Sequence, residues 1–263
     1  MQQPSQLIIR SPHDAILIHV KIHVPSHGRL DALRDFFRRR QVSDAGPYSV
    51  VHYSQEGEDV LLSRIFGPQE FGFYVDVGAH DPRKYSNTYL FYKRGWTGIS
   101  IDPRPGFANL ANKFRPRDVN LEVGVGLHGD TTDYFTFPAT ALNTTSESRL
   151  HEIPGRSNRR RIKIQKLSEI LEVNLPAGTT AIDFMTVDTE GGELEILQSN
   201  DWRSFRPRVI VIEISGASIE SLNLTPISRF LTMHGYESVA LLYHSAFFVG
   251  DPQLLAEWKD EGV

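Results

Sequence analysis

Four acidic residues lie at or beside the ends of apolar segments in this chain of 263 residues. Asp76 follows FYV, Asp102 follows GISI, Asp188 follows AIDFMTV, and Glu213 follows RVIVI. In a parallel sheet the carboxyl ends of the strands meet at one edge, and ligands bind in the crevice outside them. Each acid alone would also suit the N-cap of a following helix. Four together predict a ligand site.

The turn after the first segment indicates which ligand. Gly78 permits a close backbone approach and dihedral angles that a side chain forbids. Asp102 follows about 24 residues later, near the spacing at which an acid binds a ribose diol. The turn reads G-A-H-D-P instead of G-x-G-x-x-G, and its extra acid would repel a pyrophosphate. This favours S-adenosylmethionine, which carries an ammonium and a sulfonium, over NAD or FAD.

Composition excludes several kinds of chemistry. The chain has no cysteine, so disulfides, thiolate metal sites and cysteine nucleophiles are excluded. A net charge of −4 gives no electrostatic reason to expect nucleic acid as a partner. No apolar run approaches the length of about 18 residues that a membrane span needs. The charged first 24 residues make a poor signal peptide, so we expect a cytoplasmic protein without a membrane partner.

Strands and helices must alternate to bring the four acids together. We predict strands at 73–77, 98–102, 120–125, 181–188 and 208–215, with helices at 54–66, 87–93, 107–114, 167–173, 192–198 and 226–234. Such alternation implies an α/β fold with a mostly parallel, doubly wound sheet, and the hairpin at 236–250 adds an antiparallel strand. Residues 126–161 are expected to be irregular, either a substrate-facing lid or a disordered loop.

The first 50 residues read as a separate extension. Apolar residues alternate over 16–24, which predicts a strand, and 30–40 has helical spacing. We therefore divide the chain into an extension, 1–50, and a cofactor-binding domain, 51–263. The extension is either an added edge element or a contact surface for a second subunit, and the second alternative predicts a homo-oligomer.

Four ordered motifs carry a family resemblance. SQEGED (54–59), VDVGAHDP (75–82), SNTYLFYKRGWTGISIDPRP (86–105) and VDTEGGELEIL (187–197) resemble the FkbM-type family of S-adenosylmethionine-dependent methyltransferases. The resemblance spans about residues 50–250. It implies a class I methyltransferase, Rossmann-like sheet and O-methylation of a sugar, glycan or secondary-metabolite hydroxyl.

The resemblance also implies site residues. Asp188, Glu190 and Glu193 form its D-x-E-G-x-E motif, and Asp102 takes the position of the ribose-binding acid. Pro82 stands where the family commonly has glycine, which would stiffen the turn. Contacts to the cofactor are implied for Gln55, Asp76, Gly78, Ala79, Asn87, Thr88, Asp102 and Asp188.

Methyl transfer to a hydroxyl benefits from a general base or a metal, because the hydroxyl is a weak nucleophile. His80, in the first turn, is the leading candidate base; Asp188 and His244 are further catalytic candidates. Asp188 and Glu213 close neighbouring strands and would suit Mg²⁺. Alternatively, Asp188 contacts the cofactor or a helix N-terminus and no metal binds.

Two other functions remain open from the sequence. One is a nicotinamide-dependent oxidoreductase, which uses a similar sheet. The absence of a glycine-rich phosphate-binding turn argues against this function. A non-catalytic nucleoside-binding domain would keep the fold alone. The methyl acceptor is not encoded in any motif of this chain.

Overall fold

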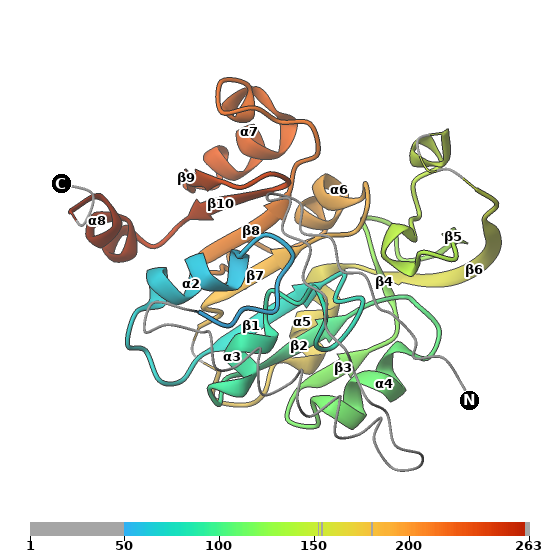
Figure 1. The fold of residues 1–263 in the computed structure, drawn as a ribbon, viewed down its shortest axis with the longest axis horizontal. Helices are drawn as coiled ribbons and strands as arrows, with labels where there is room; N and C mark the ends of the chain where they lie inside the picture. The colour runs from blue at the N-terminus through green and yellow to red at the C-terminus, as the bar shows by residue number, and fades with distance from the viewer. Residues whose placement is uncertain (1–49, 152, 154, 180, 261–263) are drawn as a thin grey trace, which may run out of the picture. The chain divides into compact units, whose positions relative to one another are not determined.

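The order of the strands in the sheet differs from their order in the chain. In the computed structural model, which describes residues 50–151, 153, 155–179 and 181–260, seven strands form the order β3-β2-β1-β7-β8-β10-β9 (Figure 1). β10 is antiparallel to both of its neighbours, and the other pairs are parallel. The predicted fold class is thereby confirmed. The bounds are β1 Phe73–Val77, β2 Thr97–Ile101, β3 Val119–Leu121, β7 Phe184–Val187, β8 Val209–Glu213, β9 Glu237–Leu241 and β10 Ser245–Val249.

Helices cover both faces of the sheet because its strands are apolar on both sides. Val75 and Val77 of β1 face one hydrophobic cluster with Leu171, whereas Tyr74 faces another with Phe91. The first cluster includes residues of α5, α6 and α7, and the second includes residues of α2, α3 and α8. The helices are α2 Glu58–Phe66, α3 Tyr89–Lys93, α4 Phe107–Phe114, α5 Leu167–Asn174, α6 Glu193–Gln198, α7 Pro226–Met233 and α8 Pro252–Asp260.

The segment 126–161 is not irregular, and that expectation was wrong. It contributes β5 (Thr131–Thr136), η1 (Thr140–Leu142), η2 (Ser148–His151) and the first half of β6 (Asn158–Gln165). With β4 (Gly124–Val125) the described strands form a second sheet, β4-β6-β5. Phe135, Phe137 and Ile153 pack into a hydrophobic cluster of its own. We call residues 126–165 the cap.

Smaller differences concern element ends. The single strand predicted at 120–125 is two strands, β3 and β4, which belong to different sheets. Helix α8 was not predicted, and its N-terminal proline occupies a favourable first position. The strand and helix expected within residues 1–49 lie outside the described residues. None of the described helices has the length and apolarity to cross a membrane.

Candidate functional site

Two adjoining pockets open at the carboxyl ends of the parallel strands. Counting the solvent space at their mouths, the first has an empty volume of about 580 Å³ and the second of about 870 Å³. They share Ala141, Asp188 and Glu190, so they adjoin along a shared wall made of these residues. The first is lined by residues that include Gly78, His80, Asp102, Tyr134, Thr140, Asn143 and Asp188. The second includes Gln55, Glu56, Glu58, Tyr85, Asn87, Arg149, Glu213, Ser215, His244 and Ser245.

Gly78 allows β1 and β7 to meet at the floor of the first pocket. Its φ is +88°, and a Cβ there would lie 1.7 Å from the carbonyl oxygen of Asp188. The backbone nitrogens of Gly78 and Ala79 donate to the carbonyl of Ile101, at 2.9 and 3.1 Å. The turn is thus held against both neighbouring strands, which leaves no room for a side chain.

Asp102 lies in the first pocket, as its strand-end position predicts. Its Oδ2 accepts from the backbone nitrogen of His80 at 2.8 Å, and its Oδ1 accepts from that of Arg104 at 2.7 Å. Burial raises the pKa of Asp102, and these two backbone donors act against that rise. A carboxylate oxygen accepts more than one hydrogen bond, so each oxygen can still accept from a ligand hydroxyl.

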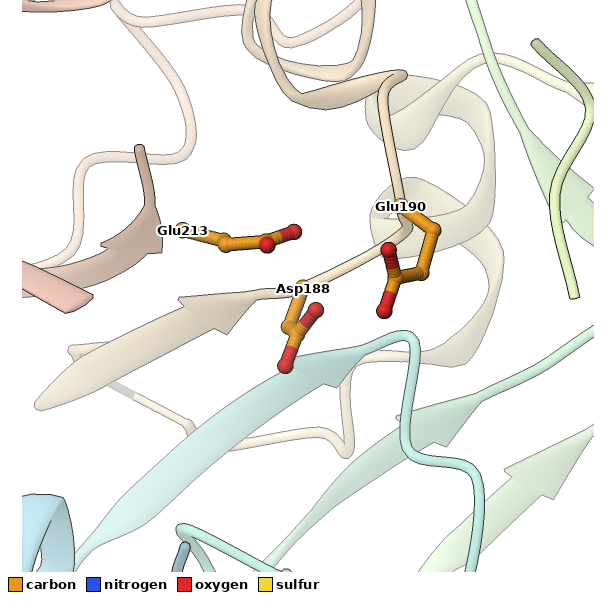
Figure 2. Close-up of side chains that lie close together, drawn as sticks. All are labelled: Asp188, Glu190 and Glu213. Atoms are coloured by element: carbon orange, nitrogen blue, oxygen red, sulfur yellow. The ribbon is translucent and has the colours of Figure 1, made fainter. Parts of the chain in front are cut away.

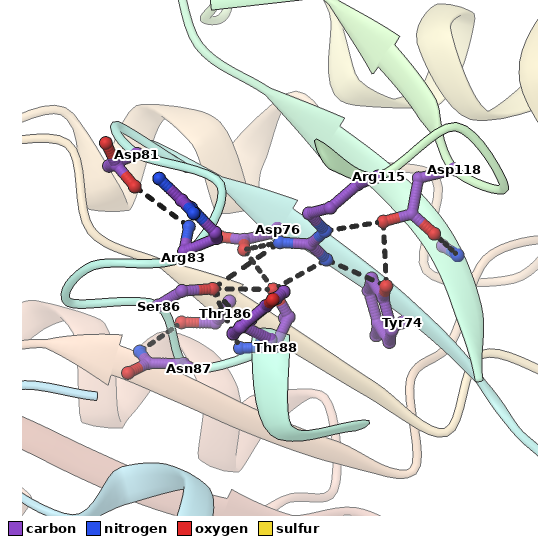
Figure 3. A network of polar contacts seen from close by, with 12 residues as sticks. Tyr74, Asp76, Asp81, Arg83, Ser86, Asn87, Thr88, Arg115, Asp118 and Thr186 are labelled. Carbon is purple, nitrogen blue, oxygen red and sulfur yellow. Dashed lines mark hydrogen bonds and ion pairs between the residues drawn. The ribbon is translucent and has the colours of Figure 1, made fainter. Parts of the chain in front are cut away.

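Asp76 and Thr88 belong to a buried network centred on Arg115 (Figure 3). The Thr88 hydroxyl donates to Asp76 at 2.5 Å, and Arg115 Nη1 lies 4.0 Å from the same oxygen. Arg115 also pairs with Asp118 at 2.8 Å and donates to the Tyr74 hydroxyl at 2.7 Å. The Asp76 and Thr88 side chains line neither pocket, so the structure does not bring them to the place that the sequence predicts.

The buried Asp76 carboxylate makes stability depend on pH. Burial raises the pKa of Asp76 to about 6, against its ordinary 3.8, although Arg115 opposes the rise. The folded state therefore binds this proton more tightly, so stability is gained as pH falls through 6. We expect the stability of the wild type relative to Asp76→Asn to rise by about 1 kcal/mol between about pH 7.5 and about pH 5, measured by urea unfolding.

Asp201 supplies the control for this comparison. Its side chain is exposed, and a hydrogen bond from Ser204 lowers its pKa. The difference between the wild type and Asp201→Asn should therefore stay constant over the same pH interval. A constant difference for Asp76→Asn as well would contradict the raised pKa.

Three carboxylates converge at the shared wall (Figure 2). Asp188 follows β7, Glu213 ends β8, and one oxygen of each lies within 4.8 Å of the others and of Glu190. The Asp188 side chain is accessible to solvent in the crevice, but protein atoms surround it on most sides. This burial and the negative charge of Glu213 raise the pKa of Asp188 well above the usual range. Burial likewise raises the pKa of Glu190, against the effect of Arg149. Asp188 and Glu213 thus lie close together, as their positions at the ends of neighbouring strands predict.

The cap docks on this cluster through Glu190. Arg149 of η2 forms an ion pair with the Glu190 carboxylate, and the Thr144 hydroxyl donates to its backbone carbonyl at 2.7 Å. Glu190 has a left-handed φ of +59°, which turns its side chain toward the other two acids. Neither Arg149 nor Thr144 was predicted as a site residue, because their position depends on the packing of the cap.

The two candidate histidines lie in different pockets. His80 Nε2 is 2.9 Å from the hydroxyl of Thr140 in the first pocket, and burial lowers the pKa of His80. His244 lines the second pocket, where its backbone nitrogen donates to Glu56 at 2.9 Å. Its Nδ1 is buried and has no hydrogen-bond partner among the described residues. His244, and not His80, therefore lies beside the second pocket's carboxylates.

A model of the methyltransferase FkbM domain matches residues 76–238, more than half of the chain. The chain belongs to the FkbM methyltransferase family. Membership agrees with the sheet order and with the motifs at the strand ends, and it makes the chain an S-adenosylmethionine-dependent methyltransferase.

Two solved structures are similar to this FkbM methyltransferase at low scores. A TehB-like SAM-dependent methyltransferase from Corynebacterium glutamicum is 12% identical, with a TM-score of 0.39 over 84% of this chain and 99% of the other. An O-methyltransferase from Bacillus cereus in complex with SAH is 11% identical, with a TM-score of 0.38 over 86% and 92%. Similarity at this level does not indicate the activity of this chain. No curated protein matches the chain.

The remaining predicted cofactor residues of this FkbM methyltransferase divide between the pockets and the interior. Gln55 and Asn87 line the second pocket, where Asn87 donates to the Thr186 hydroxyl at 2.9 Å. Ala79 packs against Phe107 at the start of α4. The amides of Gln55 and Asn87 thus lie across the shared wall from Asp102.

Proposed function

We propose that this FkbM methyltransferase transfers the methyl group of S-adenosylmethionine to a hydroxyl of a sugar, glycan or secondary metabolite. The observation that carries the proposal is that the two pockets adjoin along the shared wall of Ala141, Asp188 and Glu190. A cofactor in one pocket and an acceptor in the other would meet at this wall. Displacement at a methyl carbon depends chiefly on such alignment.

The first pocket suits the cofactor. Each oxygen of Asp102 accepts one backbone hydrogen bond and can accept a second from a ribose hydroxyl, and Gly78 keeps the floor of the pocket clear. Tyr134 and Asn143 of the cap close the pocket around a nucleoside. When bound, the cofactor supplies an electrophilic methyl group on a sulfonium. The residues of this chain bind it, orient it and exclude water.

The second pocket suits a polar acceptor. Gln55, Asn87 and Ser215 offer amide and hydroxyl groups that can bind hydroxyls. His244 is the base that we favour over His80, since it lines the acceptor pocket beside that pocket's carboxylates. Where no metal is bound, Asp188 is the second proton acceptor, because its raised pKa brings proton uptake closer to neutral pH.

Mg²⁺ fits the carboxylates of the shared wall. Asp188, Glu190 and Glu213 offer three oxygens within reach of one ion, and hard cations prefer such ligands. An ion there would relieve the repulsion that raises the pKa of Asp188 and would lower the pKa of an acceptor hydroxyl. Arg149 competes for Glu190, so Asp188 and Glu213 are the ligands that we propose first.

Calorimetry tests the proposal with three titrants. We expect S-adenosylhomocysteine to bind and NAD to give no heat of binding. Asp102→Ala should weaken S-adenosylhomocysteine at least about tenfold, because charge-assisted hydrogen bonds are lost. Mg²⁺ should bind the wild type and bind Asp188→Asn at least about tenfold more weakly.

Asp201→Ala, at an exposed position outside both pockets, should match the wild type in all three titrations. Tight NAD binding without S-adenosylhomocysteine binding would support the oxidoreductase instead. Mg²⁺ affinity that is unchanged in Asp188→Asn would remove the metal and leave the methyl transfer standing.

A further inference from the structure

The second pocket carries an excess of negative charge. Its lining contains five carboxylates, whereas Arg149 is the one guanidinium or ammonium group among the described residues that line it. Arg149 is already paired with Glu190. The five acids are Glu56, Glu58, Asp188, Glu190 and Glu213.

Neutral groups, not cations, hold two of these acids in place. Glu58 is 3% exposed and accepts from the Ser245 hydroxyl at 2.9 Å and from the Glu56 nitrogen at 2.8 Å. Glu56 accepts from the backbone nitrogen of His244 at 2.9 Å. Such donors stabilise a carboxylate without cancelling its charge, so the field of both acids extends into the pocket.

A metal ion would not reverse this excess. A divalent cation on Asp188, Glu190 and Glu213 would leave Glu56 and Glu58 uncompensated. A proton shared between Asp188 and Glu213 would likewise leave the pocket negative. The net charge of the pocket is therefore negative with and without Mg²⁺, and the pocket would repel an anionic acceptor in either case.

Two further residues of the lining, Tyr85 and His244, bear on the kind of ligand that the pocket binds. Tyr85 lines the pocket and is 50% exposed, and the Lys84 ammonium lies 4.5 Å from the centre of its ring. An aromatic face of this kind accepts both cations and sugar rings. His244 also lines the pocket, and its buried Nδ1 has no partner among the described residues.

We infer that the methyl acceptor is an amino sugar or a related amino polyol, with a protonated amine close to the hydroxyl that is methylated. The amine is drawn by Glu56 and Glu58, and the remaining hydroxyls meet the amides of Gln55 and Asn87. The inference rests on the proposed function, because it takes the second pocket as the acceptor pocket.

Three probes of one ring shape test the charge. Methyl glucosaminide, methyl glucoside and methyl glucuronide are cationic, neutral and anionic at neutral pH. Their affinities for the full chain saturated with S-adenosylhomocysteine are measured by ligand-observed NMR. We expect the glucosaminide to bind at least about tenfold more tightly than the glucoside, and the glucuronide to bind most weakly. The preference should shrink in about 1 M NaCl.

Matched variants locate the preference. Glu56→Gln should reduce the preference for the glucosaminide at least about threefold, because it removes a charge and keeps the shape. Glu70→Gln, at an exposed position outside the pocket, should leave the preference unchanged.

Three results would overturn the inference: equal affinities for all probes, tighter binding of the glucuronide, or no binding of any probe while S-adenosylhomocysteine binds. Failure of S-adenosylhomocysteine itself to bind would refute the proposed function, and the inference with it.

Discussion

Gly78→Ala is expected to abolish S-adenosylhomocysteine binding and to destabilise the fold by about 3 kcal/mol or more. The new Cβ would lie 1.7 Å from the carbonyl oxygen and 2.6 Å from the carbonyl carbon of Asp188. Both are backbone atoms, so the clash cannot be relieved by a side-chain rotation. The ends of β1 and β7 would have to separate, which moves Asp188 and the turn that leads to His80. Calorimetry measures the binding, and urea unfolding measures the stability.

Gly178→Ala separates the clash from the cost of the backbone conformation. Gly178 has a φ of +89°, almost the value of Gly78, but a Cβ there would meet no atom within 4 Å. The Gly178→Ala variant should lose only about 1–2 kcal/mol of unfolding free energy and should bind S-adenosylhomocysteine as the wild type does. If Gly78→Ala behaved like Gly178→Ala, the close contact between β1 and β7 would have no role in the site.

Arg115→Met is expected to cost about 3–5 kcal/mol of unfolding free energy. The Arg115 guanidinium is fully buried and contacts Asp118, the Tyr74 hydroxyl and Thr88, the last at 3.0 Å. Methionine fills similar volume but leaves the Asp118 and Asp76 carboxylates buried without their cation. Urea unfolding at about pH 7.5, where Asp76 is ionised, measures the loss.

Arg117→Met is the matched control. Arg117 lies two residues further along and is exposed, with one hydrogen bond to the carbonyl of Tyr92, so its loss should cost less than about 1 kcal/mol. In the double variant Arg115→Met, Asp118→Asn, part of the stability should return, because one unpaired charge is removed. A cost for Arg115→Met no larger than that of Arg117→Met would show that the buried charges are not coupled.

The elements of the main sheet follow closely from the sequence. The prediction for β1 matches the observed Phe73–Val77, and the prediction for α4 matches Phe107–Phe114, because apolar runs and turn residues bound both. The cap was missed because β6 begins with exposed arginines. Ile162 and Ile164 nevertheless alternate with Arg161 and Lys163, a strand signal that the polar surroundings obscured.

The site was predictable where it depends on strand ends and not where it depends on tertiary packing. Asp102 and Asp188 directly follow their strands, Glu213 ends its strand, and all three line the pockets, as expected from the topology. Asp76 also ends a strand, but its side chain meets Arg115, and no local pattern marks an arginine beyond α4 as a buried partner. The ion pair between Arg149 and Glu190 joins two segments that lie far apart in the sequence. No spacing of residues in the chain predicts that these segments come together.

The place of β10 between β8 and β9 sets the sequence in which the sheet can assemble. Although β9 is synthesised first, β10 is its one partner among the strands that the structure describes, so β9 joins these strands after β10 is inserted. Phe247 and Phe248 of β10 are both fully buried. On the ribosome, the nascent chain therefore exposes the edge of β8 until translation has passed Val249, and an unpaired strand edge is where aggregation begins.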